Sequence, residues 1–335
     1  MSKWPHLQCP AHQLPLILQQ GKGAEESAYE CGAGCYAPVV DRVPRFVESS
    51  NYAAGFGLQW KHFSKTQLDS DTGTTISKDR LTRCVGGSLE VLRGKSVLEV
   101  GCGSGRFTEV MLAAGAKVFA CDLSEAVEAN YENCHGAENY FVCQADLRQL
   151  PVEPHSFEVV VCIGVIQHTP SPEETICKLS SYLKPGGLLV IDHYAPGYSQ
   201  NFFQRTLRSI LIRLPASVAK PLALMLARSL LPVHRLSWTN GRGSGRYRRF
   251  LLKHSPLVDY YDAYRELGPA RLSQWSVLDT HDTLTDYYKH LRTTEQISES
   301  LRSCGLVDIE VSYGGNGVEA RAKMPVSDGR ETEDN

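Results

Sequence analysis

The segment SVLEVGCGSGRFTEV, residues 96–110, decides how the chain folds. Its first five residues are mostly apolar, and three glycines follow in a G-x-G-x-G spacing: Gly101, Gly103 and Gly105. An apolar run that enters a glycine loop and continues into a helical pattern predicts a buried parallel strand, a tight loop and a helix. Because glycine lets the backbone approach a ligand closely, this unit predicts a nucleotide-type site.

The same loop argues against two common phosphate sites. The dinucleotide fingerprint G-x-G-x-x-G requires its third glycine at position 106, where this chain has Arg106. A phosphate P-loop requires Lys-Ser or Lys-Thr after the last glycine, and neither pair is present. The loop therefore favours a nucleoside without a pyrophosphate over a dehydrogenase-like nucleotide site.

The following residues continue to alternate between strand and helix patterns. Further strands are expected at 116–122, 139–146, 157–164 and 188–194, with helices at 107–115 and 171–183. Such alternation with right-handed crossovers predicts an α/β fold with helices on both faces of a parallel sheet. A final pair of strands near 305–325, the last one antiparallel, completes a seven-stranded, mostly parallel, doubly wound (Rossmann-like) sheet. Ligands bind at the carboxyl ends of such strands, where Asp122 and Asp146 are expected.

Several motifs, in this order along the chain, resemble the class I S-adenosylmethionine-dependent methyltransferases: VLEVGCGSGRFT, ACDLS, ADLRQLP, CIGVIQHTPSPEE and LKPGGLLVI. The resemblance covers residues 77–195 and 291–325, which form the expected methyltransferase core. It implies S-adenosylmethionine as cofactor and methyl transfer to an oxygen or nitrogen acceptor.

The resemblance also implies roles for individual residues. Gly101, Gly103 and Gly105 would pass under the amino-acid part of the cofactor, and Glu99 would help to hold it. Asp122 would accept hydrogen bonds from the ribose hydroxyls, and Asp146–Leu147 would contact the adenine. The residues themselves leave an alternative open, in which Asp122 and Asp146 only cap helices.

Residues 51–76 form a lead-in to the core that is rich in aromatic and amide side chains. The stretch FGLQW resembles a segment that lies across the cofactor in the same methyltransferase group, so Gln59 and Trp60 are expected to cover the cofactor. The alternative is a helix that packs its aromatic residues on the sheet.

Residues 1–50 carry a second constellation, Cys9-Pro-Ala-His12 followed by Cys31-Gly-Ala-Gly-Cys35. Two pairs of soft ligands on tight turns suit tetrahedral zinc. The segment resembles the short zinc ribbon that precedes some methyltransferase domains, although His12 stands where a cysteine is usual and the second pair has three intervening residues. The alternative is a metal-free hairpin with free thiols.

Composition limits the class of protein. The chain has 335 residues, a net charge of −2 and 11 cysteines. No apolar run reaches the roughly 18 residues that a membrane span requires. Because the cysteines are odd in number and scattered through strand-like segments, we expect reduced, buried thiols and a cytoplasmic protein. The polar residues 326–335 are expected not to fold alone.

Residues 196–290 form a helical insert with an unusual charge pattern. Residues 193–258 contain eleven Lys and Arg and no Asp or Glu, so the rest of the chain carries 24 basic and 37 acidic residues, a balance of −13. An amphipathic helix is expected at 203–214, and the apolar helix at 220–231 is expected to be too short to span a bilayer. Such an insert suits peripheral contact with an anionic membrane, binding of RNA, or packing on the core with a solvated basic rim.

Acceptor-side chemistry is expected at the ends of the fourth and fifth core strands, where His168 and His193 are the candidate catalytic bases. A base is needed when the acceptor is a hydroxyl or a protonated amine. The stretches LDTHD and GGNG resemble zinc-ribbon methyltransferases of saccharide and glycolipid assembly, which implies a small-molecule or lipid-linked saccharide acceptor. RNA methylation and non-catalytic S-adenosylmethionine binding remain the alternatives.

Overall fold

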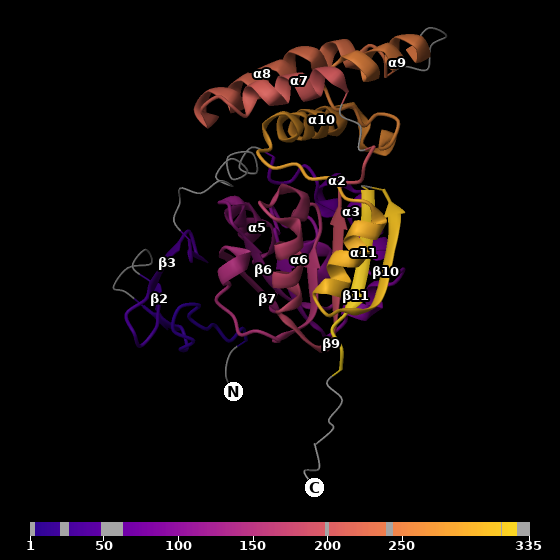
Figure 1. Ribbon diagram of the computed structural model, residues 1–335. Coiled ribbons are helices and arrows are strands. Elements are labelled where there is room, and N and C mark those ends of the chain that lie inside the picture. The colour runs from indigo at the N-terminus through magenta and orange to yellow at the C-terminus, as the bar shows by residue number, and fades with distance from the viewer. Residues whose placement is uncertain are drawn as a thin grey trace.

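The computed structural model describes residues 4–20, 27–47, 63–197, 201–238, 244–315 and 317–326. It contains a central seven-stranded sheet, a small N-terminal sheet beside it and a layer of helices over one end of the strands (Figure 1).

The central sheet has the strand order β10-β11-β9-β8-β5-β6-β7. Every neighbouring pair is parallel except the two pairs made by β11, which is antiparallel to both β9 and β10. The expected fold class, a mostly parallel Rossmann-like sheet, is therefore confirmed. The strands are β5 (Ser96–Val100), β6 (Lys117–Asp122), β7 (Tyr140–Gln144), β8 (Phe157–Cys162), β9 (Leu183–His193), β10 (Val307–Gly314) and β11 (Gly317–Lys323).

Both faces of the central strands are buried, as their apolar sequences require, whereas the edge strand β10 is largely exposed. Leu98 belongs to one apolar cluster and Val97 to another, because successive side chains of a strand point to opposite faces. The first cluster is closed by residues of α6 (Pro172–Ser180) and α11 (Thr294–Ser303). The second is closed by residues of α3 (Ile76–Cys84), α4 (Thr108–Ala113) and α5 (Ala126–Cys134). Short helices α2 (Asp69–Thr72), η1 (Leu89–Leu92), η2 (Leu147–Gln149) and η3 (Ile166–His168) complete the core.

One strand begins earlier than the sequence predicts. Strand β9 includes the Lys-Pro-Gly-Gly turn, because Gly186 N–H donates to the carbonyl oxygen of Met324 and Met324 N–H donates to that of Gly187, both at 2.9 Å. A Cβ at Gly187 would lie 2.8 Å from the carbonyl oxygen of Lys184. The turn is thus held in the sheet by the residue that follows β11.

The N-terminal sheet has the antiparallel order β1-β2-β3-β4 and sits beside β7 (Figure 1). Phe46 N–H donates to the carbonyl oxygen of Gln144 at 2.8 Å. The buried Arg45 guanidinium donates to the Gln144 side chain at 3.2 Å and to Glu128 at 2.7 Å. These contacts fix the small sheet to the edge of the large one. Its strands are β1 (Ile17–Gln19), β2 (Ala28–Glu30), β3 (Tyr36–Val40) and β4 (Val43–Pro44).

The helical insert forms two layers over the carboxyl ends of the strands. In Figure 1, α10 lies next to the sheet, and α7, α8 and α9 lie beyond it. One expectation is wrong: the apolar helix expected at 220–231 runs for 20 residues and, by length and composition alone, suffices to cross a membrane. The insert helices are α7 (Phe202–Leu211), α8 (Ala216–Arg235), α9 (Ser244–His254), η4 (Arg265–Leu267) and α10 (Gly268–Thr285).

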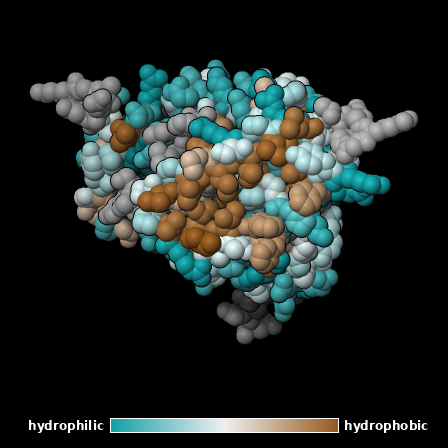
Figure 2. All heavy atoms as spheres, turned by 90° about the horizontal axis from the view of Figure 1, so that it is seen from above, coloured by the Kyte–Doolittle hydropathy of each residue, from teal (hydrophilic) through white to brown (hydrophobic). Residues whose placement is uncertain are grey.

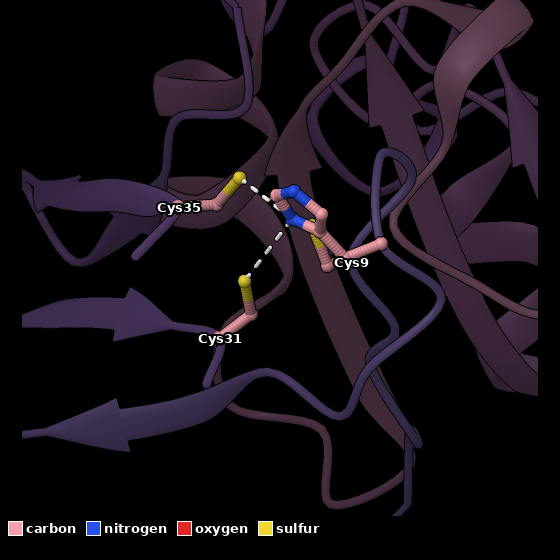
Figure 3. Close-up of side chains that lie close together, drawn as sticks. Cys9, Cys31 and Cys35 are labelled. Atoms are coloured by element: carbon pink, nitrogen blue, oxygen red, sulfur yellow. Dashed lines mark hydrogen bonds between the residues drawn. The ribbon is translucent and has the colours of Figure 1, made fainter. Parts of the chain in front are cut away.

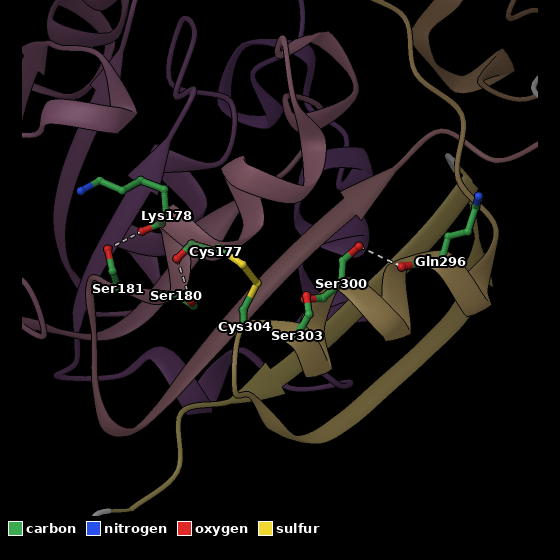
Figure 4. Close-up of a disulfide and its surroundings, with 8 residues drawn as sticks. All are labelled: Cys177, Lys178, Ser180, Ser181, Gln296, Ser300, Ser303 and Cys304. Atoms are coloured by element: carbon green, nitrogen blue, oxygen red, sulfur yellow. Dashed lines mark hydrogen bonds between the residues drawn. A yellow bond between two sulfur atoms is a disulfide. The ribbon is translucent and has the colours of Figure 1, made fainter.

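The expectation that all cysteines are reduced is also wrong. Cys177 of α6 and Cys304, just after α11, form a disulfide that joins the two helices on one face of the sheet (Figure 4). The remaining nine cysteines are free, and eight of them are buried. Because the two cysteines are 127 residues apart in the sequence, no local pattern indicates that they pair.

Candidate functional site

A cavity of about 300 Å³ lies where the strand order reverses, between the loops that follow β5 and β8. Because β5 has neighbours on both sides whose connections run in opposite directions, the loops diverge and leave a crevice. The loops after β5 to β9 form its floor and α10 forms its roof. The sequence-predicted residues that line it are Gly101, Gly103, Asp122, Asp146, Leu147 and His168.

The glycine loop after β5 adopts a backbone that other residues do not readily adopt. Gly101 and Gly105 have φ values of 75° and 99°, in the left-handed region. A Cβ at Gly101 would lie 2.2 Å from Val165 Cγ2, and one at Gly105 would lie 3.0 Å from Cys134 Sγ. Glycine is therefore required at both positions, and the loop backbone forms an open cradle along the cavity wall.

Asp122 at the end of β6 is fixed by this loop. Its Oδ2 accepts a hydrogen bond from Gly103 N–H at 3.0 Å, and its Oδ1 accepts from the Ser124 N–H and hydroxyl at 2.8 and 2.7 Å. Burial raises the pKa of Asp122, and these donors oppose that shift. The result is a carboxylate held in one orientation at the cavity wall.

Glu99 lies behind the loop and not among the residues that line the cavity. It is 3% exposed, and its Oε2 accepts a hydrogen bond from the Thr108 hydroxyl at 2.5 Å. The same hydroxyl accepts from Asn130 at 3.0 Å. Burial raises the pKa of Glu99 to about 8, so the side chain is mainly protonated at neutral pH. Its contacts support the loop from below.

Asp146 lines the cavity and also caps a short helix. Its Oδ1 accepts from Arg148 N–H at 2.9 Å as the N-cap of η2. Partial burial raises the pKa of Asp146, but hydrogen bonds from Arg148 outweigh burial and lower the pKa below its usual value. Leu147 follows at the cavity wall.

The roof of the cavity was not predicted from the sequence. One face of α10, continued by the residue just after the helix, lines the cavity at positions 275, 279, 282–283 and 286, which are three or four apart as one side of a helix requires. The acidic residues recurring at this spacing in 279–286 were the available signal, but nothing local tied that segment to the glycine loop. The five residues are Trp275, Asp279, Asp282, Thr283 and Asp286.

Two arginines line the cavity, and one of them, Arg106, connects its floor to its roof. Its guanidinium carbon lies 5.3 Å from the Trp275 ring centroid, and its Nε donates to Ser77 Oγ at 2.9 Å. Burial lowers the pKa of Arg106 to about 10, so it stays charged at neutral pH. Arg80 pairs with Asp192, and its Nε has no hydrogen-bond partner among the described residues. That unsatisfied buried donor suits an anionic ligand group.

The two candidate bases lie in different places. His168 lines the cavity, and its Nδ1 lies 3.0 Å from the carbonyl oxygen of Tyr288. Because a carbonyl can only accept, Nδ1–H donates and Nε2 keeps its lone pair. Burial lowers the pKa of His168, which keeps the ring neutral at neutral pH. His193 is 1% exposed, bonds the carbonyl oxygen of Tyr194 through Nδ1 and is not among the residues that line the cavity. Gln59 and Trp60 lie outside the described residues.

The four predicted metal ligands converge at the N-terminal sheet (Figure 3). Their ligand atoms lie within 4.8 Å of one another. His12 Nδ1 lies 3.7, 3.6 and 3.3 Å from the sulfur atoms of Cys9, Cys31 and Cys35. In a tetrahedral zinc site, Zn–S and Zn–N bonds of ordinary length place nitrogen and sulfur about 3.6 Å apart. The cluster is therefore compatible with zinc.

Comparison with known proteins finds similarity in the middle of the chain, over strands β5 to β9. Residues 98–191 match the family described as "Methyltransferase domain". The chain is 37% identical over 102 residues to a ubiquinone biosynthesis O-methyltransferase of Bordetella bronchiseptica, covering 29% of this chain and 41% of that protein. A Coxiella burnetii protein with the same description is 34% identical over 101 residues, covering 29% and 43%. The chain thus spans less than half the length of these curated relatives.

Two of the solved structures that resemble part of this chain are described as methyltransferases. Phosphoethanolamine N-methyltransferase 2 of Haemonchus contortus, in complex with S-adenosyl-L-methionine, has a TM-score of 0.39 at 18% identity, covering 71% of this chain and 38% of that one. A putative S-adenosyl-L-methionine-dependent methyltransferase of Methanococcus maripaludis has a TM-score of 0.44 at 14% identity, covering 84% and 97%.

Proposed function

We propose that this protein is an S-adenosylmethionine-dependent methyltransferase that acts on a small-molecule acceptor. One observation carries the proposal. The glycine loop after β5 and Asp122, which are joined by a hydrogen bond from Gly103 N–H, both line the cavity and both belong to the segment that matches the methyltransferase domain. The strand order places that cradle at the reversal point of the sheet, where α/β proteins bind ligands.

The residues of the floor fit each part of the cofactor. Gly101 and Gly103 line the cavity without side chains, which suits close approach of the amino-acid part. The fixed carboxylate of Asp122 suits hydroxyl donors such as those of a ribose. The unpartnered Nε–H of Arg80 suits a carboxylate, and Asp146–Leu147 border the far end of the cavity floor, where an adenine would lie.

Bound S-adenosylmethionine supplies a methyl group that is already activated by attachment to a sulfonium. With the cofactor bound, the acceptor oxygen or nitrogen would bond to the methyl carbon as the carbon–sulfur bond breaks, and the electron pair of that bond would stay on sulfur in S-adenosylhomocysteine. Holding the acceptor in line supplies much of the rate. The ring of His168, whose pKa burial lowers, accepts the proton that a hydroxyl acceptor loses.

We propose a hydroxyl group on an aromatic or otherwise apolar small molecule as the acceptor. Trp275, Tyr260, Tyr264 and Tyr194 line the cavity beside the acids of α10, so its acceptor side offers flat apolar surfaces together with polar groups. The curated relatives are described as O-methyltransferases of ubiquinone biosynthesis, a description in keeping with this choice. A lipid-linked saccharide receives no comparable support.

The direct test is methyl transfer by the purified full chain. We would incubate it with methyl-labelled S-adenosylmethionine and a panel of catechols, phenols and saccharides, and analyse the products by mass spectrometry. Label on a phenolic oxygen is the expected result. S-adenosylhomocysteine binding without transfer to any member of the panel would favour the non-catalytic alternative, and label on a saccharide would overturn the acceptor class.

A further inference from the structure

The outer helices α7, α8 and α9 carry a large exposed apolar face. Figure 2, viewed from the side of these helices, shows apolar residues gathered in a broad band across that side of the molecule. The large apolar side chains of these helices and their ends that are between 37% and 73% exposed are Phe202, Phe203, Ile210, Leu214, Val218, Leu222, Met225, Val233, Leu236, Tyr247, Phe250 and Leu252. We call this set the outer apolar face.

Helix α8 exposes several large apolar side chains, whereas a helix on a water-facing surface exposes mainly polar ones. Its buried residues include three alanines that cluster with α10: Ala219 and Ala223 with Leu284, and Ala227 with Val277. Four of its larger apolar residues are exposed, and only 17% of its most apolar window is buried; the exposed ones are Val218, Leu222, Met225 and Val233. Four leucines are half-buried against the clusters beneath, Leu224, Leu226, Leu230 and Leu231. A soluble helix buries its large apolar residues and exposes polar ones, so α8 is built to contact a second apolar medium.

Basic side chains surround this face. Arg208 and Arg248 are used internally, in ion pairs with Asp286 and with Asp259 and Asp262. The remaining exposed ones have no ion pair with any carboxylate in the described part of the chain. These are Arg205, Arg213, Arg228, Arg235, Arg246, Arg249 and Lys253. Apolar side chains beside unpaired cations match the acyl chains and phosphates of an anionic lipid surface.

The contacts that hold α8 to its neighbours favour a helix that lies in a membrane interface over one that spans a membrane. His234 near the end of α8 is fully buried, and its Nδ1 lies 2.8 Å from Asp259. Asp259 also accepts from Trp238 at 3.0 Å and from Arg248 at 2.9 Å. A membrane-spanning α8 would have to break this buried network and carry Lys220 and Arg228 into the hydrocarbon. Lying in the interface requires neither.

We propose that α7, α8 and α9 dock the protein on an anionic membrane surface, with the outer apolar face in the headgroup region and the exposed arginines on lipid phosphates. This proposal goes beyond methyl transfer and does not depend on it, because lipid binding is measured without cofactor. The docked orientation places α10, and the cavity beneath it, close to the lipid.

The test is co-sedimentation of the full chain with vesicles of phosphatidylcholine alone or mixed with phosphatidylglycerol, over a salt series. We expect binding to the mixed vesicles that weakens, without vanishing, as salt rises. Met225→Gln together with Leu236→Gln should lower affinity at least roughly tenfold, because both side chains are removed from the lipid. The matched control, Val307→Gln with Tyr313→Gln, changes exposed apolar residues of β10 and should leave binding unchanged.

The charge arm uses Arg205→Gln, Arg213→Gln and Arg228→Gln, each expected to lower affinity for mixed vesicles about fivefold. Lys117→Gln, an exposed residue at the opposite end of the strands, is the control. Lack of vesicle binding at low salt would overturn the proposal. So would a dimer that the Met225 and Leu236 changes dissociate, or RNA binding that outcompetes vesicles. Resistance of bound protein to an alkaline carbonate wash would overturn the interfacial arrangement in favour of a spanning α8.

Discussion

The floor of the cavity, formed by the loops after β5 to β9, differs from its roof, formed by α10, in how each holds its charged groups. On the floor, Asp122 is fixed by donors that lie close to it in the chain: Ser124, two residues later, and Gly103, in the loop after the neighbouring strand. On the roof, Asp286 is paired with Arg208 of α7, 78 residues away in the chain, as well as with the nearby Lys289. The floor is thus a local structure, whereas the roof exists only once the insert has packed.

The largest effect on activity is expected where floor and roof meet, at His168. Replacing it by Gln removes the proposed proton acceptor and should lower kcat with a hydroxyl acceptor by roughly 10²–10⁴-fold. Because burial lowers the pKa of His168, the wild-type rate should rise with pH through a value below the usual histidine range, and this acid limb should vanish in the variant. His135→Gln, an exposed histidine outside the cavity, serves as control. An unchanged pH profile would contradict the assignment.

A large effect on stability is expected from the buried ion-pair network of the roof. Asp286→Ala leaves Arg208 and the 7%-exposed Lys289 without their shared carboxylate, and breaking such a buried pair costs roughly 3–5 kcal/mol. Glu173→Ala breaks the more exposed pair with Arg292 and should cost about 0–1 kcal/mol. Denaturant unfolding of the two variants compares them, and equal losses would show that the roof is not held as described.

A smaller, pH-dependent effect is expected from Glu99 under the floor. Its pKa is raised in the folded state to about 8 from a usual value of 4.5, so the folded state favours the protonated form. This contribution to stability is complete at low pH and is lost as pH rises through about 8. Glu99→Gln cannot ionise, so the difference in unfolding free energy between variant and wild type should shift in favour of the variant from pH 5 to pH 9. A pH-independent difference would exclude a neutral Glu99.

The smallest effect on the cavity is expected from loss of metal at the N-terminal sheet. The purified protein should carry close to one zinc per chain, and Cys31→Ser should lose it, because four converging ligands are needed. The same variant should keep S-adenosylhomocysteine affinity nearly unchanged, since none of the four ligands lines the cavity. Elemental analysis that finds no zinc in native protein would contradict the zinc site and favour a metal-free hairpin with free thiols.

The comparison also explains what could be predicted from the sequence. The cradle, Asp122 and Asp146 follow from short-range patterns, because a strand, its loop and its helix are consecutive in the chain. Trp275 and Asp279 reach the same cavity only through packing of α10 over the sheet, which no local pattern encodes. The Cys177–Cys304 disulfide was missed for the same reason. On α7, the predicted apolar stripe is divided: Leu211 packs inward, whereas Phe203 and Ile210 remain exposed. Hydropathy alone does not reveal which medium an apolar stripe contacts.

The measurement that tests the central claim most directly is calorimetric binding of S-adenosylhomocysteine to the wild-type chain and to Asp122→Ala. The wild type should bind, and the variant should bind more weakly by about 1–3 kcal/mol, because ligand hydroxyls lose a charged acceptor. Asp146→Ala provides a comparison at the other end of the floor. Unchanged affinity in Asp122→Ala, or absence of binding to the wild type, would contradict the assignment of this cavity as a cofactor site.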